Sequence, residues 1–124
     1  MRFRVENMVR YPILPVSAPR QLRNTRFSAR DAFRIQRYHA FRDEVRLRRV
    51  KLPIPAYVRF EMPVPKSGLD RVGKPHEQKP DKDNLEKALL DALFGEDCHV
   101  YSTLCEKLWA LQGGIVIGTL LREV

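Results

Sequence analysis

The chain has 124 residues, of which 44% are hydrophobic and 31% charged, a mixture typical of a folded domain. This length excludes a multidomain enzyme, so residues 1–124 are predicted to form a single domain. The formal net charge of +8 favours a polyanionic partner, either nucleic acid or an anionic membrane surface. The sequence has no apolar stretch long enough to span a membrane and no signal peptide, so we expect a cytoplasmic protein without a membrane partner.

The charge is distributed unevenly between the two halves of the sequence. Residues 1–60 carry 15 Lys and Arg against 4 Asp and Glu, whereas residues 61–124 carry 8 against 11. A nuclease needs cations that hold phosphates and clustered carboxylates that hold metal ions, while a simple binding module needs only the cations. An acidic segment is also compatible with a solvated surface, so the positions of the carboxylates decide between a metal site and a solvated surface.

The N-terminal half predicts a strand, a basic loop and a helix. Polar and apolar residues alternate over residues 1–9, which is typical of a strand, and the prolines of residues 11–27 predict an extended basic loop. Ser28 is a plausible N-cap for a helix over residues 29–49, with an apolar stripe that includes Phe41 and Val45. The opposite face carries Arg30, Arg34, Arg37, Arg42, Arg46 and Arg49, which fits either a phosphate-facing surface or a solvated one.

The C-terminal half predicts a strand over residues 56–64, a flexible loop over 65–80 and a helix over 81–94. Two further strands follow at residues 100–111 and 114–121, and Gln112, Gly113 and Gly114 between them indicate a hairpin. The fold class is therefore predicted as α+β, with a small mixed sheet of about four strands and two main helices.

An acidic segment surrounds the predicted second helix. Asp81 and Asp83 can converge only if Asp81 caps the helix and Asp83 lies in its first turn, which the preceding Pro80 favours. Helix capping and the helix dipole account for these two carboxylates, but not for Asp97 after the helix. Carboxylates without matching Cys or His spacing favour Mg²⁺ or Mn²⁺ over zinc.

Two basic or titratable side chains near this segment have alternative interpretations. Lys87 lies four residues after Asp83, so it could form a surface ion pair with it or contact the scissile phosphate. His76 lies in the predicted loop, where a histidine is usually solvent-exposed or in contact with phosphate.

The sequence around these residues resembles the RusA family of Holliday junction resolvases, which are largely encoded by phages and prophages. The resemblance lies in Pro75-His76-x-x-Lys79-Pro80-Asp81-x-Asp83-Asn84-Leu85-x-Lys87-x-x-x-Asp91-Ala92-Leu93 and in Glu96-Asp97-x-His99-Val100. It implies that Asp81, Asp83 and Asp97 bind the metal ion and that Lys87 assists catalysis. It also implies a homodimer that cuts four-way DNA junctions symmetrically with magnesium. Glu96 and His99 stand where the family usually has Asp and Gln.

The length of the second helix leaves the origin of the third ligand open. Asp83 and Phe94 are eleven positions apart, which corresponds to about 16 Å of helix. Either the chain doubles back at Gly95, or the partner subunit of a two-fold dimer supplies Asp97.

The leading hypothesis is a Mg²⁺-dependent, structure-selective endodeoxyribonuclease of DNA recombination and repair, with Mn²⁺ as an alternative cofactor and branched DNA as its partner. A non-catalytic nucleic-acid-binding protein and a protein whose acidic segment docks a basic partner are the alternatives. The expected DNA contacts are Arg20, Arg23, Arg26, Arg30, Arg34, Arg37, Lys79 and Lys82.

Overall fold

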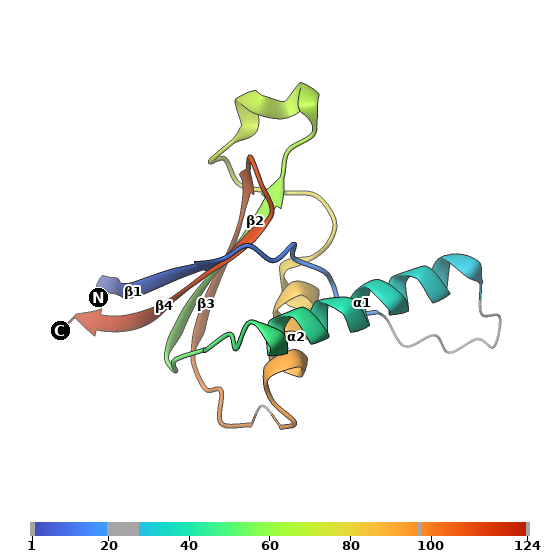
Figure 1. Cartoon of the computed structure of the whole chain (residues 1–124). Helices are drawn as coiled ribbons and strands as arrows, with labels where there is room; N and C mark the ends of the chain where they lie inside the picture. The colour runs from blue at the N-terminus through green and yellow to red at the C-terminus, as the bar shows by residue number, and fades with distance from the viewer. Residues whose placement is uncertain (1, 20–27, 97, 124) are drawn as a thin grey trace.

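The computed structural model describes residues 2–19, 28–96 and 98–123 (Figure 1). A mixed sheet of four strands forms one layer, and the two long helices lie together beside it. The α+β prediction with two main helices is therefore confirmed. No helix in the described ranges has the length and apolar character needed to cross a membrane.

The sheet has the strand order β1-β4-β2-β3. Strand β4 (Gly114–Glu123) pairs antiparallel with both β1 (Arg2–Tyr11) and β2 (Ala56–Pro63). Strand β3 (Thr103–Ala110) pairs parallel with β2. The start of β1 and the end of β4 therefore lie together at the end of the sheet that points away from the helices (Figure 1).

The predicted hairpin between the last two strands is wrong, because β2 lies between β3 and β4. A helix between β2 and β3 provides the long connection that parallel neighbours require. The chain then passes across the end of β2 before β4 begins. Arg10 supports this turn, since its Nη2 donates to the carbonyls of Gln112 at 3.3 Å and Gly113 at 3.2 Å. A Cβ atom on Gly114 would lie 2.5 Å from the same Arg10 nitrogen, so a larger residue would displace it.

Helix α1 (Ala29–Leu47) begins at a capping box. The Ser28 hydroxyl accepts a hydrogen bond from the Asp31 backbone, and the Asp31 carboxylate accepts one from the Ser28 backbone at 3.1 Å. The helix ends earlier than residue 49 because Arg49 adopts a left-handed conformation with φ of 52°. Phe41 and Val45 are its buried residues.

Helix α2 (Lys82–Leu93) is held much more firmly in the core. Leu85, Ala88, Leu89 and Ala92 are all buried, at the spacing that places them on one helix face. They join a core that includes Ile13, Phe41, Val45, Val58, Phe60, Ile115 and Ile117. The start of α2 is thus fixed relative to the sheet.

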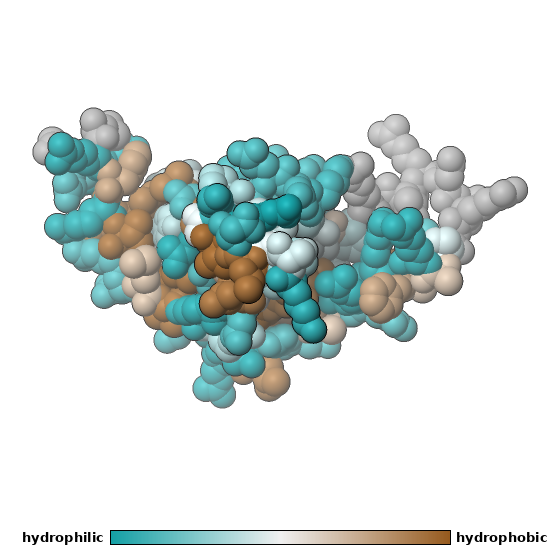
Figure 2. Space-filling model, turned by 90° about the horizontal axis from the view of Figure 1, so that it is seen from above, coloured by the Kyte–Doolittle hydropathy of each residue, from teal (hydrophilic) through white to brown (hydrophobic). Residues whose placement is uncertain are grey.

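The loop predicted over residues 65–80 is more ordered than expected. It contains a 3-10 helix, η1 (Lys66–Arg71), which projects beyond the sheet (Figure 1). Residues 73–76 then run beside β3, where the amide of Gly73 donates to Trp109 and the amide of Trp109 donates to Lys74. Seen from above, this end of the molecule shows a compact hydrophobic area among hydrophilic groups (Figure 2), and Leu69 is 62% exposed.

Candidate active site

Asp81 and Asp83 occupy the positions that the sequence predicts at the start of α2. Asp81 is the N-cap residue with extended backbone, and its carbonyl accepts from the amides of Asn84 and Leu85 at 3.2 Å. Asp83 lies in the first turn. Both side chains are exposed, and within the described part of the chain the Asp81 carboxylate makes no capping hydrogen bond. Two exposed carboxylates at the start of α2 are therefore available to a cation.

The donor chemistry at this point fits a hard divalent ion, since it consists of carboxylate oxygens with the amide of Asn84 nearby. Over residues 2–19, 28–96 and 98–123, no three His, Cys, Asp or Glu side chains form a complete metal cluster. Asp97, the predicted third ligand, lies outside the described residues.

The observed length of α2 is close to the length that the sequence predicts for this helix. Asp83 and Leu93 are ten positions apart, which corresponds to about 15 Å of helix. In Figure 1 the start of α2 lies near the loop that follows η1, and its other end lies on the far side of the molecule. The two possible origins of the third ligand, the same chain or a partner, both remain compatible with this geometry.

Lys87 is exposed on α2, and among the described side chains no ion pair joins it to Asp83. The neighbouring Glu86 is engaged differently, because its Oε1 accepts a hydrogen bond from Thr103 of β3 at 2.7 Å. Glu86 therefore ties α2 to the sheet, while the Lys87 ammonium is available to a ligand.

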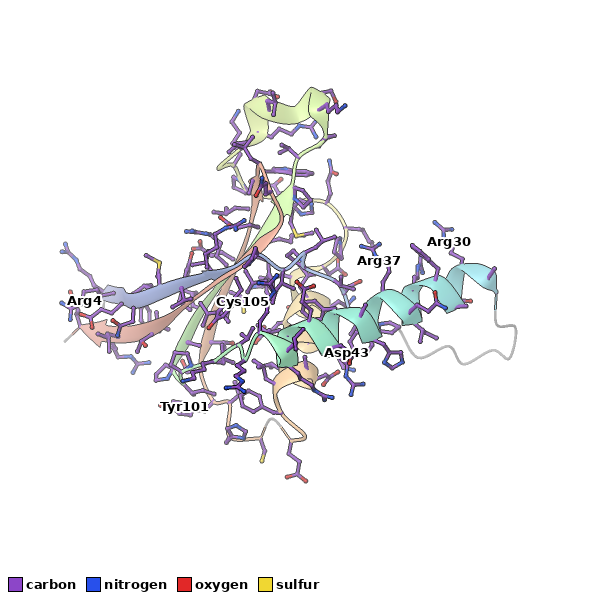
Figure 3. The ribbon with its side chains drawn as sticks, in the orientation of Figure 1. Arg4, Arg30, Arg37, Asp43, Tyr101 and Cys105 are labelled. Atoms are coloured by element: carbon purple, nitrogen blue, oxygen red, sulfur yellow. The ribbon has the colours of Figure 1, made fainter. Side chains whose placement is uncertain are left out.

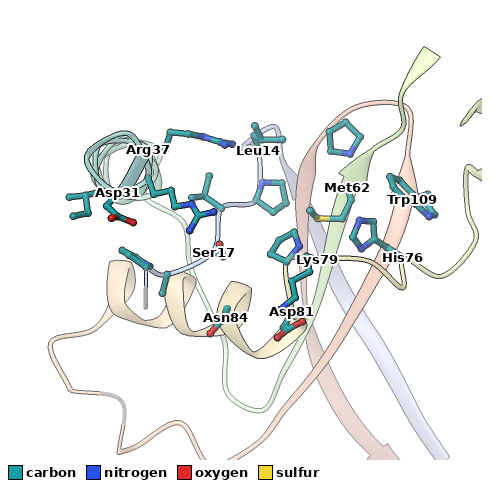
Figure 4. A pocket seen from close by; sticks show the side chains of 18 residues that line it. Leu14, Ser17, Asp31, Arg37, Met62, His76, Lys79, Asp81, Asn84 and Trp109 are labelled. Carbon is teal, nitrogen blue, oxygen red and sulfur yellow. The ribbon is translucent and has the colours of Figure 1, made fainter. Parts of the chain in front are cut away.

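A cavity of about 750 Å³ opens beside Asp81. It is bounded by α1, by residues 14–19 and by the start of α2, and Arg37, Lys79 and Asp81 are among its lining residues (Figure 4). Its apolar wall includes Leu14, Met62 and Trp109. The cavity thus combines the Asp81 carboxylate, cations and apolar surface around one opening, and Asp83 is not among the described residues that line it.

Arg34 and Arg37 line this cavity from α1, while Arg30 and Arg37 project to the same side of that helix (Figure 3). All three are exposed. Of the predicted DNA contacts, Arg34, Arg37 and Lys79 therefore share the cavity with Asp81, and Lys82 is exposed at the start of α2. Arg20, Arg23 and Arg26 lie outside the described residues.

The arginine face of α1 is not uniform along its length. Near the helix end, Arg46 donates its Nε hydrogen to the carbonyl of Ala92 at 3.1 Å. Tyr38 similarly connects the helices, since its hydroxyl donates to the Asp91 carboxylate at 3.2 Å. The later part of α1 is therefore used for packing against α2, and its first half presents cations.

His76 is buried, with 6% of its surface exposed, so its interpretation as a solvent-exposed residue is wrong. The physical reason is that residues 73–76 pair with β3, where the His76 amide donates to the carbonyl of Lys107 at 2.9 Å. Its ring packs against Trp109 with a centroid separation of 4.3 Å. Burial, and then the Lys107 charge, lowers the pKa of His76.

Lys107 is a residue at the site that the sequence did not single out. Its ammonium donates to the carbonyl of Gln78 at 2.6 Å and to that of Pro80 at 2.8 Å, immediately before Asp81. Burial lowers the pKa of Lys107, and the nearby Asp81 acts in the opposite direction. One feature of the sequence could have indicated Lys107. It lies two residues after Cys105, so the two side chains share one face of β3, and the Cys105 side chain is buried.

Comparison with known proteins identifies the family of the chain. A search of curated proteins finds no match. The family model described as endodeoxyribonuclease RusA matches residues 12–118, a span that contains both helices, the paired aspartates and most of the sheet. The protein belongs to the RusA family of endodeoxyribonucleases.

Proposed function

We propose that the protein is a magnesium-dependent endodeoxyribonuclease that resolves Holliday junctions by paired, symmetric phosphodiester hydrolysis in DNA recombination and repair. The observation that carries this proposal is that α2 begins with two exposed carboxylates, Asp81 and Asp83, and that Asp81 lines a cavity together with Arg34 and Arg37. Family membership supports the nuclease activity. The carboxylates and the cations supply the two kinds of charge that phosphodiester hydrolysis requires.

In this proposal Asp81, Asp83 and Asp97 hold the metal ion, with Mn²⁺ as a second competent cofactor. When bound, such an ion activates water and neutralises charge on the phosphodiester. Lys87 stabilises the negative charge that develops on the phosphate or on the leaving oxygen, since its ammonium is exposed on the same helix face as Asp83.

The DNA backbone lies along the first half of α1 and the start of α2. Arg30, Arg34 and Arg37 contact phosphates from α1, and Lys79 and Lys82 contact them from the other side of the site. Arginine suits this role because its planar guanidinium donates two hydrogen bonds to one phosphate. Arg20, Arg23 and Arg26 belong to the same predicted contact set.

A homodimer is proposed because symmetric cleavage of a four-way junction requires two active sites related by a two-fold axis. The third ligand then comes from the same chain or from the partner. Mixing Asp83→Asn subunits with Asp97→Asn subunits decides between these arrangements. Cleavage at one site by the heterodimer supports a shared site, and complete loss supports a site built from one chain.

The function is tested by incubating the purified protein with a labelled four-way junction, a duplex and a single strand, each with Mg²⁺ or EDTA. We expect paired nicks in the junction with Mg²⁺ and no cleavage with EDTA. Binding that depends steeply on salt but shows neither cleavage nor a metal requirement would instead support a non-catalytic nucleic-acid-binding protein.

A further inference from the structure

A single lysine of β3 holds the segment that leads into the candidate metal site. The Lys107 Nζ donates to the carbonyls of Gln78 and Pro80 at 2.6 Å and 2.8 Å. These carbonyls stand two residues apart, and the second belongs to the residue that directly precedes Asp81. Because hydrogen bonds from an ammonium are stronger than neutral ones, the two contacts fix the course of the backbone at this point.

The lysine completes a longer line of contacts along the edge of β3. The amide of Gly73 donates to the carbonyl of Trp109 at 2.8 Å, and the amide of His76 donates to that of Lys107 at 2.9 Å. Backbone pairing stops after His76, and the Lys107 side chain holds the next residues. The chain is thus attached to β3 from residue 73 to the start of α2.

We propose that Lys107 is a positioning residue, which sets the place of the Asp81 carboxylate by holding the Gln78 and Pro80 carbonyls. This inference rests on the proposed function, in which Asp81 is a metal ligand. The N-cap position supports it, because the Asp81 carboxylate lacks a capping hydrogen bond among the described residues. Its position therefore depends on the backbone that Lys107 holds.

A positioning role of Lys107 and a purely electrostatic effect of its charge have opposite consequences for metal binding. A cation close to two carboxylates weakens the binding of a metal ion by repulsion, so removing that charge alone would tighten metal binding. Loss of a residue that orients a ligand has the opposite effect and typically weakens metal affinity or activity by about 10-fold to 100-fold. Metal affinity thus distinguishes positioning from simple charge.

The experiment compares Lys107→Met, Lys107→Arg and the control Lys66→Met, which removes an exposed lysine of η1. Melting curves confirm that each variant folds. Mn²⁺ affinity is measured by the paramagnetic signal of the free ion, and the amide resonances of Asp81 and Asn84 are followed by NMR in metal-free protein. Junction binding in EDTA and cleavage with Mg²⁺ complete the set.

For Lys107→Met we expect Mn²⁺ affinity and the maximal cleavage rate to fall by at least about 10-fold, with junction affinity in EDTA unchanged. The Asp81 and Asn84 resonances shift in this variant, Lys107→Arg restores part of each effect, and Lys66→Met behaves as wild type. Unchanged or tighter Mn²⁺ binding, or unchanged Asp81 and Asn84 resonances, would overturn the proposal. If Lys107→Met does not fold, Lys107→Gln is judged by the same criteria.

The failure of this inference is distinguishable from the failure of the proposed function. A wild-type protein that cuts no junction refutes the nuclease function, while the resonances of Asp81 and Asn84 still report whether Lys107 sets the backbone before α2. A wild-type protein that cuts, together with a Lys107→Met variant that binds Mn²⁺ normally, refutes the positioning role alone.

Discussion

The two long helices are built for different tasks. Helix α2 buries four of its 12 residues, and its first turn carries Asp83 directly after the N-cap Asp81. Helix α1 buries two of its 19 residues, and its first half presents Arg30, Arg34 and Arg37 to solvent. The carboxylates thus lie on a firmly packed element, whereas the cations lie on a loosely packed one.

This difference follows from what each group must do. Metal ligands require positions fixed within a fraction of an ångström, which packing of the supporting element provides. Phosphate contacts tolerate greater freedom, because long cationic side chains reach a charge that is repeated along the DNA backbone. The comparison predicts that changes in α2 affect chemistry or stability, while changes in the first half of α1 affect binding.

The largest expected effect is that of Asp83→Asn. Loss of a metal ligand should reduce junction cleavage on the order of a thousandfold, since the bound ion provides several kcal/mol of transition-state stabilisation. Gel-based cleavage assays with Mg²⁺ measure this loss. Junction binding in EDTA should be retained, and cleavage at the wild-type rate would exclude Asp83 as a ligand.

Leu85→Ala tests how firmly α2 is anchored. Leu85 has 0% exposure, so its truncation should lower the free energy of unfolding by about 2–5 kcal/mol. The matched control is Phe33→Ala on α1, where 59% exposure predicts a change within about 0.5 kcal/mol. Denaturant titrations measure both, and equal losses would contradict the contrast between the helices.

Arg34→Gln combined with Arg37→Gln tests the binding role of α1. Two lost phosphate contacts should weaken junction binding and reduce the slope of log K against log salt by about 1.8. Binding measured at several salt concentrations gives this slope. Arg122→Gln near the end of β4 serves as the control, and an equal change per arginine there would show that only total charge matters.

His76 is expected to give the smallest effect, a pH dependence of stability. Burial lowers its pKa in the folded state, so the unfolded state binds the proton more readily. The contribution of neutral His76 to the free energy of unfolding is fully present above about pH 6.5, and it is lost as the pH falls through the folded-state pKa. Between about pH 7.5 and 5.5, the melting temperature of wild type should therefore fall more than that of His76→Gln. An identical fall in both proteins would contradict this assignment.

The sequence predicts the local features of the site better than the contacts between distant segments. The N-cap position of Asp81 and the capping residue Ser28 follow from patterns within a few residues. The hairpin prediction was wrong because glycines mark a turn without showing that β2 lies between the strands. The burial of His76 and the contacts of Lys107 depend on residues 73–80 lying against β3, which no local pattern indicates.

The central claim is that the start of α2 performs the chemistry and α1 holds the DNA. Its most direct test is the single-turnover rate of junction cleavage at saturating protein, measured for Asp83→Asn and for the Arg34→Gln, Arg37→Gln double variant. We predict a cleavage rate for Asp83→Asn on the order of a thousandfold below wild type, and a near wild-type rate for the double variant once its weaker binding is overcome. Cleavage by Asp83→Asn at the wild-type rate, or a double variant that stays inactive at saturation, would contradict the account.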